Sequence, residues 1–244
     1  MSRVIGWFSC GIASAVACAL TLQRYPDAII VRIIIPGEHP DNDRFAANCA
    51  SWYGTQILEL QDPQKRSPWD VWQQRRYIAG PKGAPCTGEL KKLVRYRFQR
   101  PDDTHIFGYT VDEVRRANRF AQTNSELRLW YPLIDAKLTK NDCRAIIQAK
   151  GIAIPVMYQL GFRNNNCIGC PMGGAGYWNL IRLHFPTTFE RMVQLSRTLG
   201  VRIIKQDGKR VFLDELRPDT GRKGRPVESS RSAFCDDVWS TLVE

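Results

Sequence analysis

Apolar runs and helical segments alternate along the first half of the chain. Residues 4–8 are apolar, residues 12–24 are rich in alanine and leucine, and residues 29–35 are mostly β-branched. Continuous apolar runs of this length are typical of strands that are buried on both faces of a parallel sheet. We therefore expect a strand, a helix and a second strand in this order.

The alternation continues as far as about residue 122. It predicts strands at 55–60 and 105–109, and helices at 41–53, 87–99 and 111–122. This β-α-β order predicts an α/β fold with a parallel, twisted sheet flanked by helices, as in Rossmann-like proteins. Such sheets bind ligands beyond the carboxyl ends of their strands, at the point where the strand order reverses.

The pattern changes after residue 130. Helices are expected at 140–150, 177–184 and 187–199. Residues 161–177 lie between the first two of these helices and contain a pair of cysteines and several glycines. This composition predicts a specialised loop.

The C-terminal end of the chain has a different composition. Residues 201–206 and 209–214 predict a small hairpin, and a basic cluster follows among prolines and glycines. The basic cluster is either an anion-contacting segment or a solvated loop. We expect an α/β domain over 1–200, and a C-terminal extension with the hairpin and a basic, cysteine-containing tail over 201–244.

Composition and charge restrict the classes of function. The chain has 244 residues, 43% of them hydrophobic, and a formal net charge of +11. The charge favours an anionic partner such as a nucleotide, a sulfated ligand or a nucleic acid, although a protein with a merely basic surface carries the same charge. No run of about 18 apolar residues is present, so we expect no membrane span. The N-terminal residues do not resemble a signal peptide, and we expect a cytoplasmic protein.

The segment Ser9-Cys10-Gly11-Ile12-Ala13-Ser14 joins the first predicted strand to the first predicted helix. Gly11 permits a tight turn, and backbone N–H groups at the start of a helix attract anions. The hydroxyls of Ser9 and Ser14 can add hydrogen bonds to phosphate oxygens. An ordinary turn with a serine cap has the same residues, so both alternatives stay open at this point.

This segment resembles the pyrophosphate loop of the adenine-nucleotide α-hydrolase superfamily, in which Ser-Gly-Gly-x-Asp-Ser is usual. Cys10 and Ala13 stand in place of Gly and Asp, which brings the loop closer to the looser Ser-x-Gly-x-x loop of phosphoadenosine-phosphosulfate (PAPS) reductases. The resemblance extends to about residue 200. It implies a PAPS reductase-like fold that binds PAPS, adenylyl sulfate or ATP, with further nucleotide contacts after the second and fourth strands.

Two segments match those further positions. After the second strand, Glu38 and Asp41 are candidates to bind ribose hydroxyls or Mg²⁺, and Asp41 is also a candidate helix cap. His39 is a candidate acid–base group, or a cap of the helix that follows. After the fourth strand, Gly108 begins a segment that resembles the family's Gly-x-Arg-x-x-Glu/Gln motif, and Arg116 is its candidate phosphate contact.

Two of the eight cysteines form the sharpest chemical signal, Cys167-Ile168-Gly169-Cys170. Two thiolates at this spacing can bind one metal centre or form a redox pair. Cys86 lies at a predicted helix start and is followed by Lys91, Lys92 and Arg95. These cations are either a basic patch that lowers the pKa of the thiol and attracts a sulfate or phosphate, or a solvated helix face.

The layout of these cysteines resembles that of assimilatory adenylyl-sulfate reductases. Those enzymes bind a [4Fe–4S] cluster with a Cys-Cys pair and a later Cys-x-x-Cys motif, at about the 81 positions that separate Cys86 from Cys167. Pro85 stands in place of the first cysteine of the pair. The resemblance implies a [4Fe–4S] cluster held by Cys86, Cys167 and Cys170, with an open iron site or a fourth ligand, Cys235 or Cys143. A four-thiolate zinc site is the alternative.

The remaining cysteines have other expected places. Reductases of this family carry a nucleophilic cysteine on a C-terminal tail, so Cys235 is a candidate catalytic nucleophile, a fourth ligand or a buried inert thiol. Cys18, Cys49 and Cys143 fall in predicted helices, and we expect them in the core. Cys10 is expected to be exposed in its loop.

Three hypotheses of function follow. The first is a PAPS reductase-like enzyme that holds an adenylated anion and reduces or transfers its sulfur, with a thiol or electron-donor protein as partner. The second is an ATP-dependent enzyme that adenylates tRNA or DNA and inserts sulfur. The third is a nucleotide-binding, metal-stabilised protein without turnover. We expect the first.

Overall fold

The computed structural model describes residues 2–80 and 83–221. Strands and helices alternate over the first part of the chain: β1 (Val4–Trp7), α1 (Ile12–Arg24), β2 (Ile29–Ile34), α2 (Asp41–Tyr53), β3 (Leu58–Gln61), α3 (Pro68–Arg75), α4 (Pro85–Thr87), the π-helical turn η1 (Gly88–Lys92), α5 (Leu93–Phe98), β4 (Thr104–Ile106), the 3₁₀ turn η2 (Val111–Glu113), α6 (Val114–Thr123) and β5 (Arg128–Trp130).

Helices dominate the second part of the chain. They are α7 (Pro132–Asp135), α8 (Lys140–Ala149), α9 (Val156–Gln159), α10 (Ala175–His184) and α11 (Pro186–Thr198), followed by the hairpin strands β6 (Ile204–Gln206) and β7 (Lys209–Val211) and the 3₁₀ turn η3 (Leu213–Glu215).

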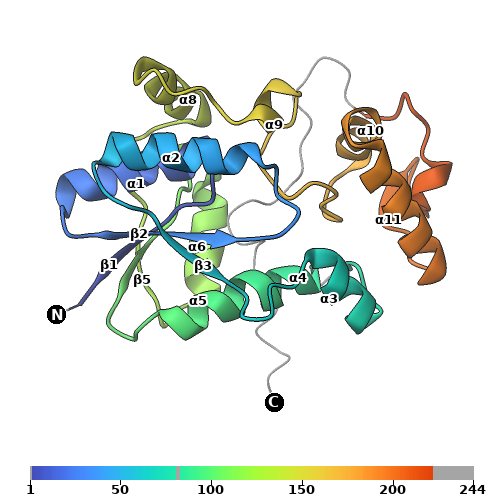
Figure 1. Ribbon diagram of the computed structural model, residues 1–244, viewed down its shortest axis with the longest axis horizontal. Helices are drawn as coiled ribbons and strands as arrows, with labels where there is room; N and C mark the ends of the chain where they lie inside the picture. Colours follow the sequence, from blue (N-terminus) through green and yellow to red (C-terminus); the bar gives the residue numbers. More distant parts are fainter. Residues whose placement is uncertain (1, 81–82, 222–244) are drawn as a thin grey trace. The chain divides into compact units, whose positions relative to one another are not determined.

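Five parallel strands form one sheet in the order β3-β2-β1-β4-β5. Ile5 of the central strand β1 pairs with Ile29 of β2 on one side and with His105 of β4 on the other. Helices α1 and α2 lie on one face of the sheet, and α5 and α6 lie on the other (Figure 1). The predicted α/β fold with a parallel sheet flanked by helices is therefore confirmed.

The central strands are buried because both of their faces are covered. Ile5, Ile30, Val31 and Ile106 are all almost fully buried. The side chains on both faces of these strands are covered, so successive residues are mostly apolar. A half-exposed strand would instead alternate apolar and polar residues. The sheet therefore fixes the loops at its carboxyl edge.

The chain groups into two compact units. Within the described residues, the first unit consists of 2–34, 40–61 and 93–155, and the second of 35–39, 62–80, 83–92 and 156–221. The first unit contains the five-stranded sheet. These units do not test the expected division at residue 200, which stays a prediction.

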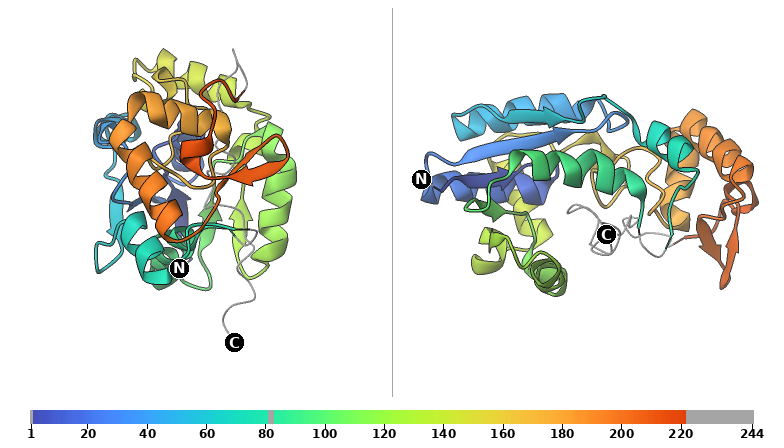
Figure 2. Two further views of the ribbon diagram at one scale, coloured as in Figure 1. Left: turned by 90° about the vertical axis from the view of Figure 1, so that its right-hand side faces the viewer. Right: turned by 90° about the horizontal axis from the view of Figure 1, so that it is seen from below.

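The second unit has its own apolar core. Buried aromatic residues from α3 and α10, among them Trp69, Trp72, Tyr177 and Trp178, pack with Met192 of α11. Figure 2 shows α10 and α11 next to each other, with the β6–β7 hairpin beside them. This core carries the loop in which the paired cysteines lie.

Several local predictions differ from the structure. The single helix expected at 87–99 is interrupted by the π-helical turn η1, and Arg95 is fully buried in the first unit. Arg95 donates to the side-chain oxygen of Asn124 at 3.2 Å and lies over the ring of Tyr96. Its expected place on a basic patch beside Cys86 is therefore wrong.

Helix α3 was not expected from the sequence, although its start carries a clear signal. Ser67 and Asp70 form a reciprocal capping box, and Pro68 occupies the first helical position. Strand β5 was also missed, because a three-residue edge strand leaves no apolar run. In the described part of the chain, no helix is long and apolar enough to cross a membrane.

Candidate functional site

The loop of residues 9–14 lies at the point where the strand order of the sheet reverses. Strand β1 leads through α1 to β2 on one side, whereas its other neighbour, β4, leads through α6 to β5 on the opposite side. The loops that follow β1 and β4 therefore lie next to each other at the carboxyl edge of the sheet, and the helices that they lead into run to opposite sides. In open α/β sheets this is the position where ligands bind.

Ser14 holds loop 9–14 in shape. Its Oγ accepts hydrogen bonds from the backbone N–H and from the hydroxyl of Ser9, each at 3.1 Å, and donates to the carbonyl of Gly11 at 2.9 Å. Ser14 is 6% exposed, whereas Ser9 is exposed. The buried serine thus organises the loop, and the exposed serine is the one that can reach a ligand.

Helix α1 presents a positive end to this loop. It is 13 residues long, begins after Gly11 without a side-chain cap, and has no acidic residue in its first turn. The aligned peptide dipoles of a helix favour negative charge at this end, and no carboxylate of the first turn offsets them. The arrangement suits a phosphate or sulfate group.

Gly108 brings the loop after β4 against the start of α1. A Cβ atom at Gly108 would lie 2.6 Å from the backbone nitrogen of Ser14 and 2.7 Å from its Cα. A residue with a Cβ atom would clash with the backbone of Ser14, so position 108 requires glycine. The two loops at the reversal point are therefore in direct contact.

Cys10 is completely buried, so its expected exposure is wrong. Its φ of 55° turns the chain into the left-handed region, and its Sγ donates to the carbonyl of Asn42 at 3.8 Å. A non-glycine residue in this conformation is strained and is held by its surroundings. Cys10 therefore anchors loop 9–14 to the start of α2.

Arg116 belongs to a chain of contacts that starts just after Gly108. Glu113 accepts hydrogen bonds from the backbone and hydroxyl of Thr110, at 3.4 and 3.3 Å, and pairs with Arg116 one helical turn later. The guanidinium also lies 5.5 Å from the centre of the Tyr109 ring. These contacts fix Arg116 in the first unit, and its phosphate contact stays a prediction.

Asp41 is the first residue of α2, and Pro40 rather than Asp41 is the cap. Both of its oxygens accept from Arg44, at 2.6 and 2.9 Å. The carboxylate is thus already engaged in a bidentate ion pair. Its predicted binding of ribose or Mg²⁺ would require a ligand to share or replace Arg44.

The paired cysteines of the second unit lie at the two ends of a tight turn. The N–H of Cys170 donates to the carbonyl of Cys167 at 3.3 Å, and Gly169 has a φ of +82°. This combination defines a type II turn with glycine at its third position. We call residues 167–170 the cysteine turn.

Tyr177 closes the cysteine turn from the side of α10. Its hydroxyl accepts from the N–H of Cys170 at 2.8 Å and donates to the carbonyl of Cys167 at 2.9 Å. Burial raises the pKa of this hydroxyl well above its usual range, which keeps it a donor. The N–H of Ile168 also donates to the carbonyl of Gly37 at 2.8 Å. Backbone groups of Cys167, Ile168 and Cys170 are therefore all fixed by hydrogen bonds.

Glu38 lies beside one thiol of this turn. Its Oε1 accepts from the Sγ of Cys167 at 3.9 Å and forms an ion pair with the Nζ of Lys91 at 3.6 Å. Neighbouring His39 packs edge-on against the ring of Phe185, with 6.1 Å between the ring centres. Three predicted residues, Glu38, Lys91 and Cys167, thus form one cluster in the second unit.

Cys86 begins the segment that carries Lys91. It is half-buried in α4 and packs against the same apolar core as Cys170. The π-helical turn η1 follows directly and ends just after Lys91, at Lys92. Such turns occur frequently at functional sites, because they displace side chains from regular helical positions.

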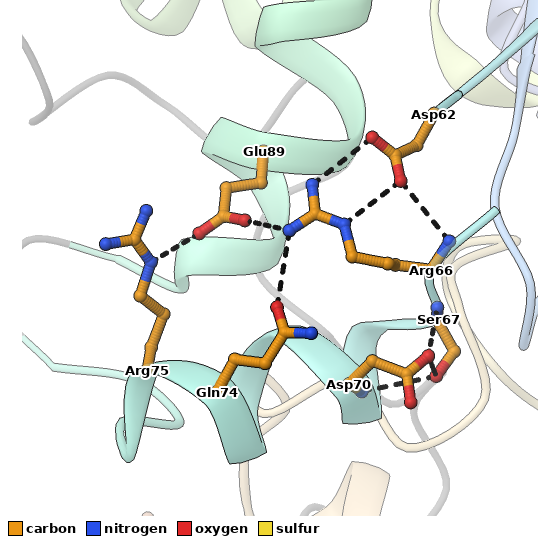
Figure 3. A network of polar contacts seen from close by, with 7 residues as sticks. All are labelled: Asp62, Arg66, Ser67, Asp70, Gln74, Arg75 and Glu89. Atoms are coloured by element: carbon orange, nitrogen blue, oxygen red, sulfur yellow. Dashed lines mark hydrogen bonds and ion pairs between the residues drawn. The ribbon is translucent and has the colours of Figure 1, made fainter. Parts of the chain in front are cut away.

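A network of charges anchors this π-helical turn (Figure 3). Glu89 accepts from Arg66 and from Arg75, each at 2.6 Å, and Arg66 also pairs with Asp62 at 3.0 Å. The carboxylates of Asp62 and Glu89 have 6% and 12% of their side chains exposed. Two mostly buried carboxylates share one guanidinium fork, which fixes the position of the turn.

The predicted site residues fall into two groups. The first unit contains the candidate nucleotide contacts Ser9, Gly11, Ser14, Asp41, Gly108 and Arg116, and the second contains Glu38, His39, Cys86, Lys91, Cys167 and Cys170. Glu38, a candidate ribose or Mg²⁺ contact, lies beside the thiol of Cys167 in the second unit, and its contact with a nucleotide stays a prediction. Cys235 lies outside the described residues, so its catalytic and ligand roles stay predictions.

The described thiols do not form a metal centre among themselves. Over residues 2–80 and 83–221, no group of three or more His, Cys, Asp or Glu side chains is arranged to hold a metal ion. The cysteine turn offers two thiols, which is fewer than a cluster or a structural zinc site requires. The [4Fe–4S] cluster and the zinc alternative stay predictions that metal analysis tests.

Sequence reasoning missed the groups that support these side chains. No motif marks the Tyr177 hydroxyl, because its partners are backbone groups. Glu89 and Arg66 carry no motif either, because they pair across 23 positions. The sequence hypotheses for Tyr177 are stacking on a base, shielding a cluster or packing in an aromatic core, and the structure buries its ring in the core of the second unit. The capping box at Ser67 was the one local signal that could have located α3, which carries Arg75 and follows Arg66.

The sheet and loop 9–14 define the class: an α/β protein with a parallel sheet and a loop at the point of strand reversal. Among solved structures, the chain is similar to the crystal structure of phosphoadenylyl-sulfate (PAPS) reductase from Candida auris in a phosphate complex. The TM-score is 0.49 and the sequence identity 10%, over 68% of this chain and 82% of that chain. No family model matches the chain, and no curated protein matches it in sequence.

Proposed function

We propose that this protein binds an adenine nucleotide, PAPS, adenylyl sulfate or ATP, at loop 9–14 and performs reductive sulfur chemistry with its thiols. The observation that carries the proposal is the position of loop 9–14 at the strand reversal, in contact with Gly108. The loop resembles that of PAPS reductases in sequence. Nucleotide binding is assigned to the first unit and thiol chemistry to the second.

Electrostatics supports an anionic ligand at the loop. The start of α1 attracts negative charge, and the exposed hydroxyl of Ser9, which donates to Ser14 in the structure, would turn from Ser14 to a phosphate oxygen when a ligand binds. The net charge of +11 raises the local concentration of anions around the whole protein. A phosphate of the nucleotide would take the place at the helix start, and its remaining groups would follow the carboxyl edge of the sheet.

The chemistry assigned to the thiols is the reduction of an adenylated sulfate. Attack of a thiolate on the sulfur displaces the nucleotide phosphate, and a second thiol then releases sulfite and leaves a disulfide. Two electrons pass from two thiols to sulfur, and an external dithiol restores them. Positioning and charge neutralisation would supply most of the rate enhancement. Cys235 and His39 stay candidates for the nucleophile and the acid–base group.

The positive charge also favours a second candidate. An enzyme that adenylates tRNA or DNA and inserts sulfur would use the same loop for ATP and its basic surface for the phosphate backbone. The two candidates differ in products: the first releases sulfite, and the second converts ATP to AMP and pyrophosphate only when nucleic acid is present. A protein that binds nucleotide and gives neither product belongs to the third, non-catalytic class.

Product analysis tests the proposal directly. The protein is reduced and freed of oxygen, mixed with PAPS or adenylyl sulfate and a dithiol donor, and assayed for sulfite and for the released nucleotide. We expect equal amounts of the two products, formed at limiting substrate about tenfold more slowly by Ser14→Ala but not by Ser51→Ala. Absence of sulfite together with AMP formation from ATP in the presence of tRNA or DNA would contradict the first candidate and support the second.

A further inference from the structure

We propose that Cys167 and Cys170 form a reversible dithiol–disulfide couple that exchanges electrons with an external thiol, and that Tyr177 is its positioning residue. The inference deepens the proposed function and rests on it, because it names the thiols that supply the two electrons. It does not require a bound metal, nucleotide or Cys235.

The geometry of the cysteine turn suits a disulfide. In a β-turn closed by a hydrogen bond, the first and fourth Cα atoms are less than about 7 Å apart. Disulfides join Cα atoms that are about 4.4–6.8 Å apart. Cys167 and Cys170 occupy these first and fourth positions, and the closing hydrogen bond is 3.3 Å long. The expected separation of these two Cα atoms therefore overlaps the range that a disulfide spans.

The turn is rigid because three separate contacts hold it. Tyr177 bridges the N–H of Cys170 and the carbonyl of Cys167, and Ile168 donates to Gly37. Gly169 has no room for a side chain, since a Cβ there would lie 2.7 Å from Cγ2 of Thr188. A fixed turn keeps the two thiols at a high effective concentration, which favours the disulfide over two mixed disulfides.

The thiols are also placed where a reductant can reach them. Cys167 and Cys170 are half-buried, whereas Cys18 and Cys49 are fully buried. Thiol exchange requires access of the incoming sulfur, so a half-buried pair on a loop is suited to it. The contact of Cys167 with Glu38 orients its side chain at the edge of the turn.

The oxidant in this exchange is an external disulfide such as oxidised glutathione. The thiolate of one cysteine attacks this disulfide, forms a mixed disulfide and releases one glutathione. The second cysteine then attacks the protein-bound sulfur, which forms the Cys167–Cys170 bond and releases the second glutathione. The dithiol loses two electrons and two protons, and an external dithiol reverses the process.

The experiment is a redox titration of the full chain. Wild type is equilibrated without oxygen in mixtures of reduced and oxidised glutathione, the remaining thiols are alkylated, and peptides are quantified by mass spectrometry. We expect one reversible transition that joins Cys167 to Cys170. A disulfide that is shared among other cysteines, or no disulfide at all, would overturn the inference. So would iron or zinc retained in the isolated protein and lost in Cys167→Ser.

The variant Tyr177→Phe tests the positioning role. Loss of the bridge loosens the turn, so the equilibrium constant for disulfide formation should fall by about threefold or more. The control Tyr131→Phe removes a hydroxyl that donates to the carbonyl of Ala117 in the first unit, and should leave the constant unchanged. An unchanged equilibrium constant in a folded Tyr177→Phe variant would refute the positioning role. If that variant does not fold, the wild-type titration still tests whether Cys167 and Cys170 form the disulfide.

Nucleotide binding separates this inference from the proposed function. Calorimetric titration of Cys167→Ser with PAPS or ATP reports on loop 9–14 alone. Binding with no Cys167–Cys170 disulfide in wild type would reject the couple and retain nucleotide binding. A working couple in a protein that binds no adenine nucleotide would reject the proposed function instead.

Discussion

The cysteines of the two units differ in packing and therefore in chemistry. In the first unit, Cys18, Cys49 and Cys143 are buried among apolar side chains. Burial raises the pKa of Cys18 well above its usual range and raises those of Cys49 and Cys143 to about 12. In the second unit, Cys86 and the cysteines of the turn are half-buried. Cysteine is thus a buried packing residue in the first unit and a partly accessible thiol in the second.

The largest expected difference is in alkylation rate. In a Cys235→Ser background at pH 8, Cys86, Cys167 and Cys170 should react with iodoacetamide at least about a hundredfold faster than Cys18, Cys49 and Cys143, because buried thiols react only after local unfolding. Peptide mass spectrometry over time measures the rates. In concentrated guanidinium chloride all of these thiols should react alike. Equal rates in the native protein would remove the contrast between the units.

The contact between the loops of the first unit predicts the next effect. Gly108→Ala inserts a Cβ 2.6 Å from the Ser14 nitrogen, and the resulting overpacking should lower the free energy of unfolding by about 3 kcal/mol. Urea denaturation measures the change. Gly174→Ala is the matched control, because its Cβ meets open space at an ordinary φ of −79°, and it should change stability by about 0.5 kcal/mol or less.

His105 should make the stability of the first unit depend on pH. Burial, followed by the charge of Arg95, lowers the pKa of His105 from 6.5 to about 4, and Trp7 donates to its Nδ1 at 3.0 Å. The unfolded chain binds a proton that the folded chain excludes, so stability is complete above about pH 6.5 and falls between pH 6.5 and 4. We expect a loss of about 2 kcal/mol, less than the full shift because some solvent screening remains.

Urea denaturation at pH 7.5 and 4.5 measures this loss. His105→Gln is the control, because an amide does not titrate in this range, and its stability should change much less between the two pH values. An equal change in wild type and His105→Gln would assign the pH dependence to other groups.

The charge network of the second unit predicts the smallest effects. Arg75→Ala removes a guanidinium with 60% of its side chain exposed and should lower stability by about 0.5 kcal/mol or less. Arg66→Met leaves the carboxylates of Asp62 and Glu89 without their shared cation and should cost about 1 kcal/mol more. Thermal and urea unfolding of both variants provide the comparison. Equal effects would mean that the two arginines hold Glu89 to the same degree.

Local sequence was sufficient where one chemical pattern dominates. The apolar runs predicted β1, β2 and the parallel sheet, and α1 and α2 have the predicted bounds. The buried positions of Cys18, Cys49 and Cys143 were expected because these residues fall in predicted helices, and they are confirmed. In each case, burial of both faces or of one helix face leaves a regular pattern along the chain.

The supporting groups could not be predicted because they depend on tertiary contacts that leave no pattern of residue types along the chain. Glu38 lies 129 positions from Cys167, and nothing in the sequence joins them. The Tyr177 hydroxyl bonds to backbone groups, which leave no residue signature. The interruption of the helix after Cys86 is equally invisible, since Glu89, Lys91 and Lys92 favour a regular helix by propensity alone.

Binding of the adenine nucleotide to loop 9–14 is the central claim, and calorimetry on serine variants tests it most directly. Ser14→Ala removes the hydroxyl that holds Ser9 and Gly11. Ser51→Ala removes an exposed hydroxyl from α2 that donates to the carbonyl of Ala47 at 3.2 Å. We predict binding of PAPS, adenylyl sulfate or ATP by wild type and Ser51→Ala, and an affinity about tenfold lower for Ser14→Ala. Equal affinity in all three proteins, or no binding by wild type, would contradict the account.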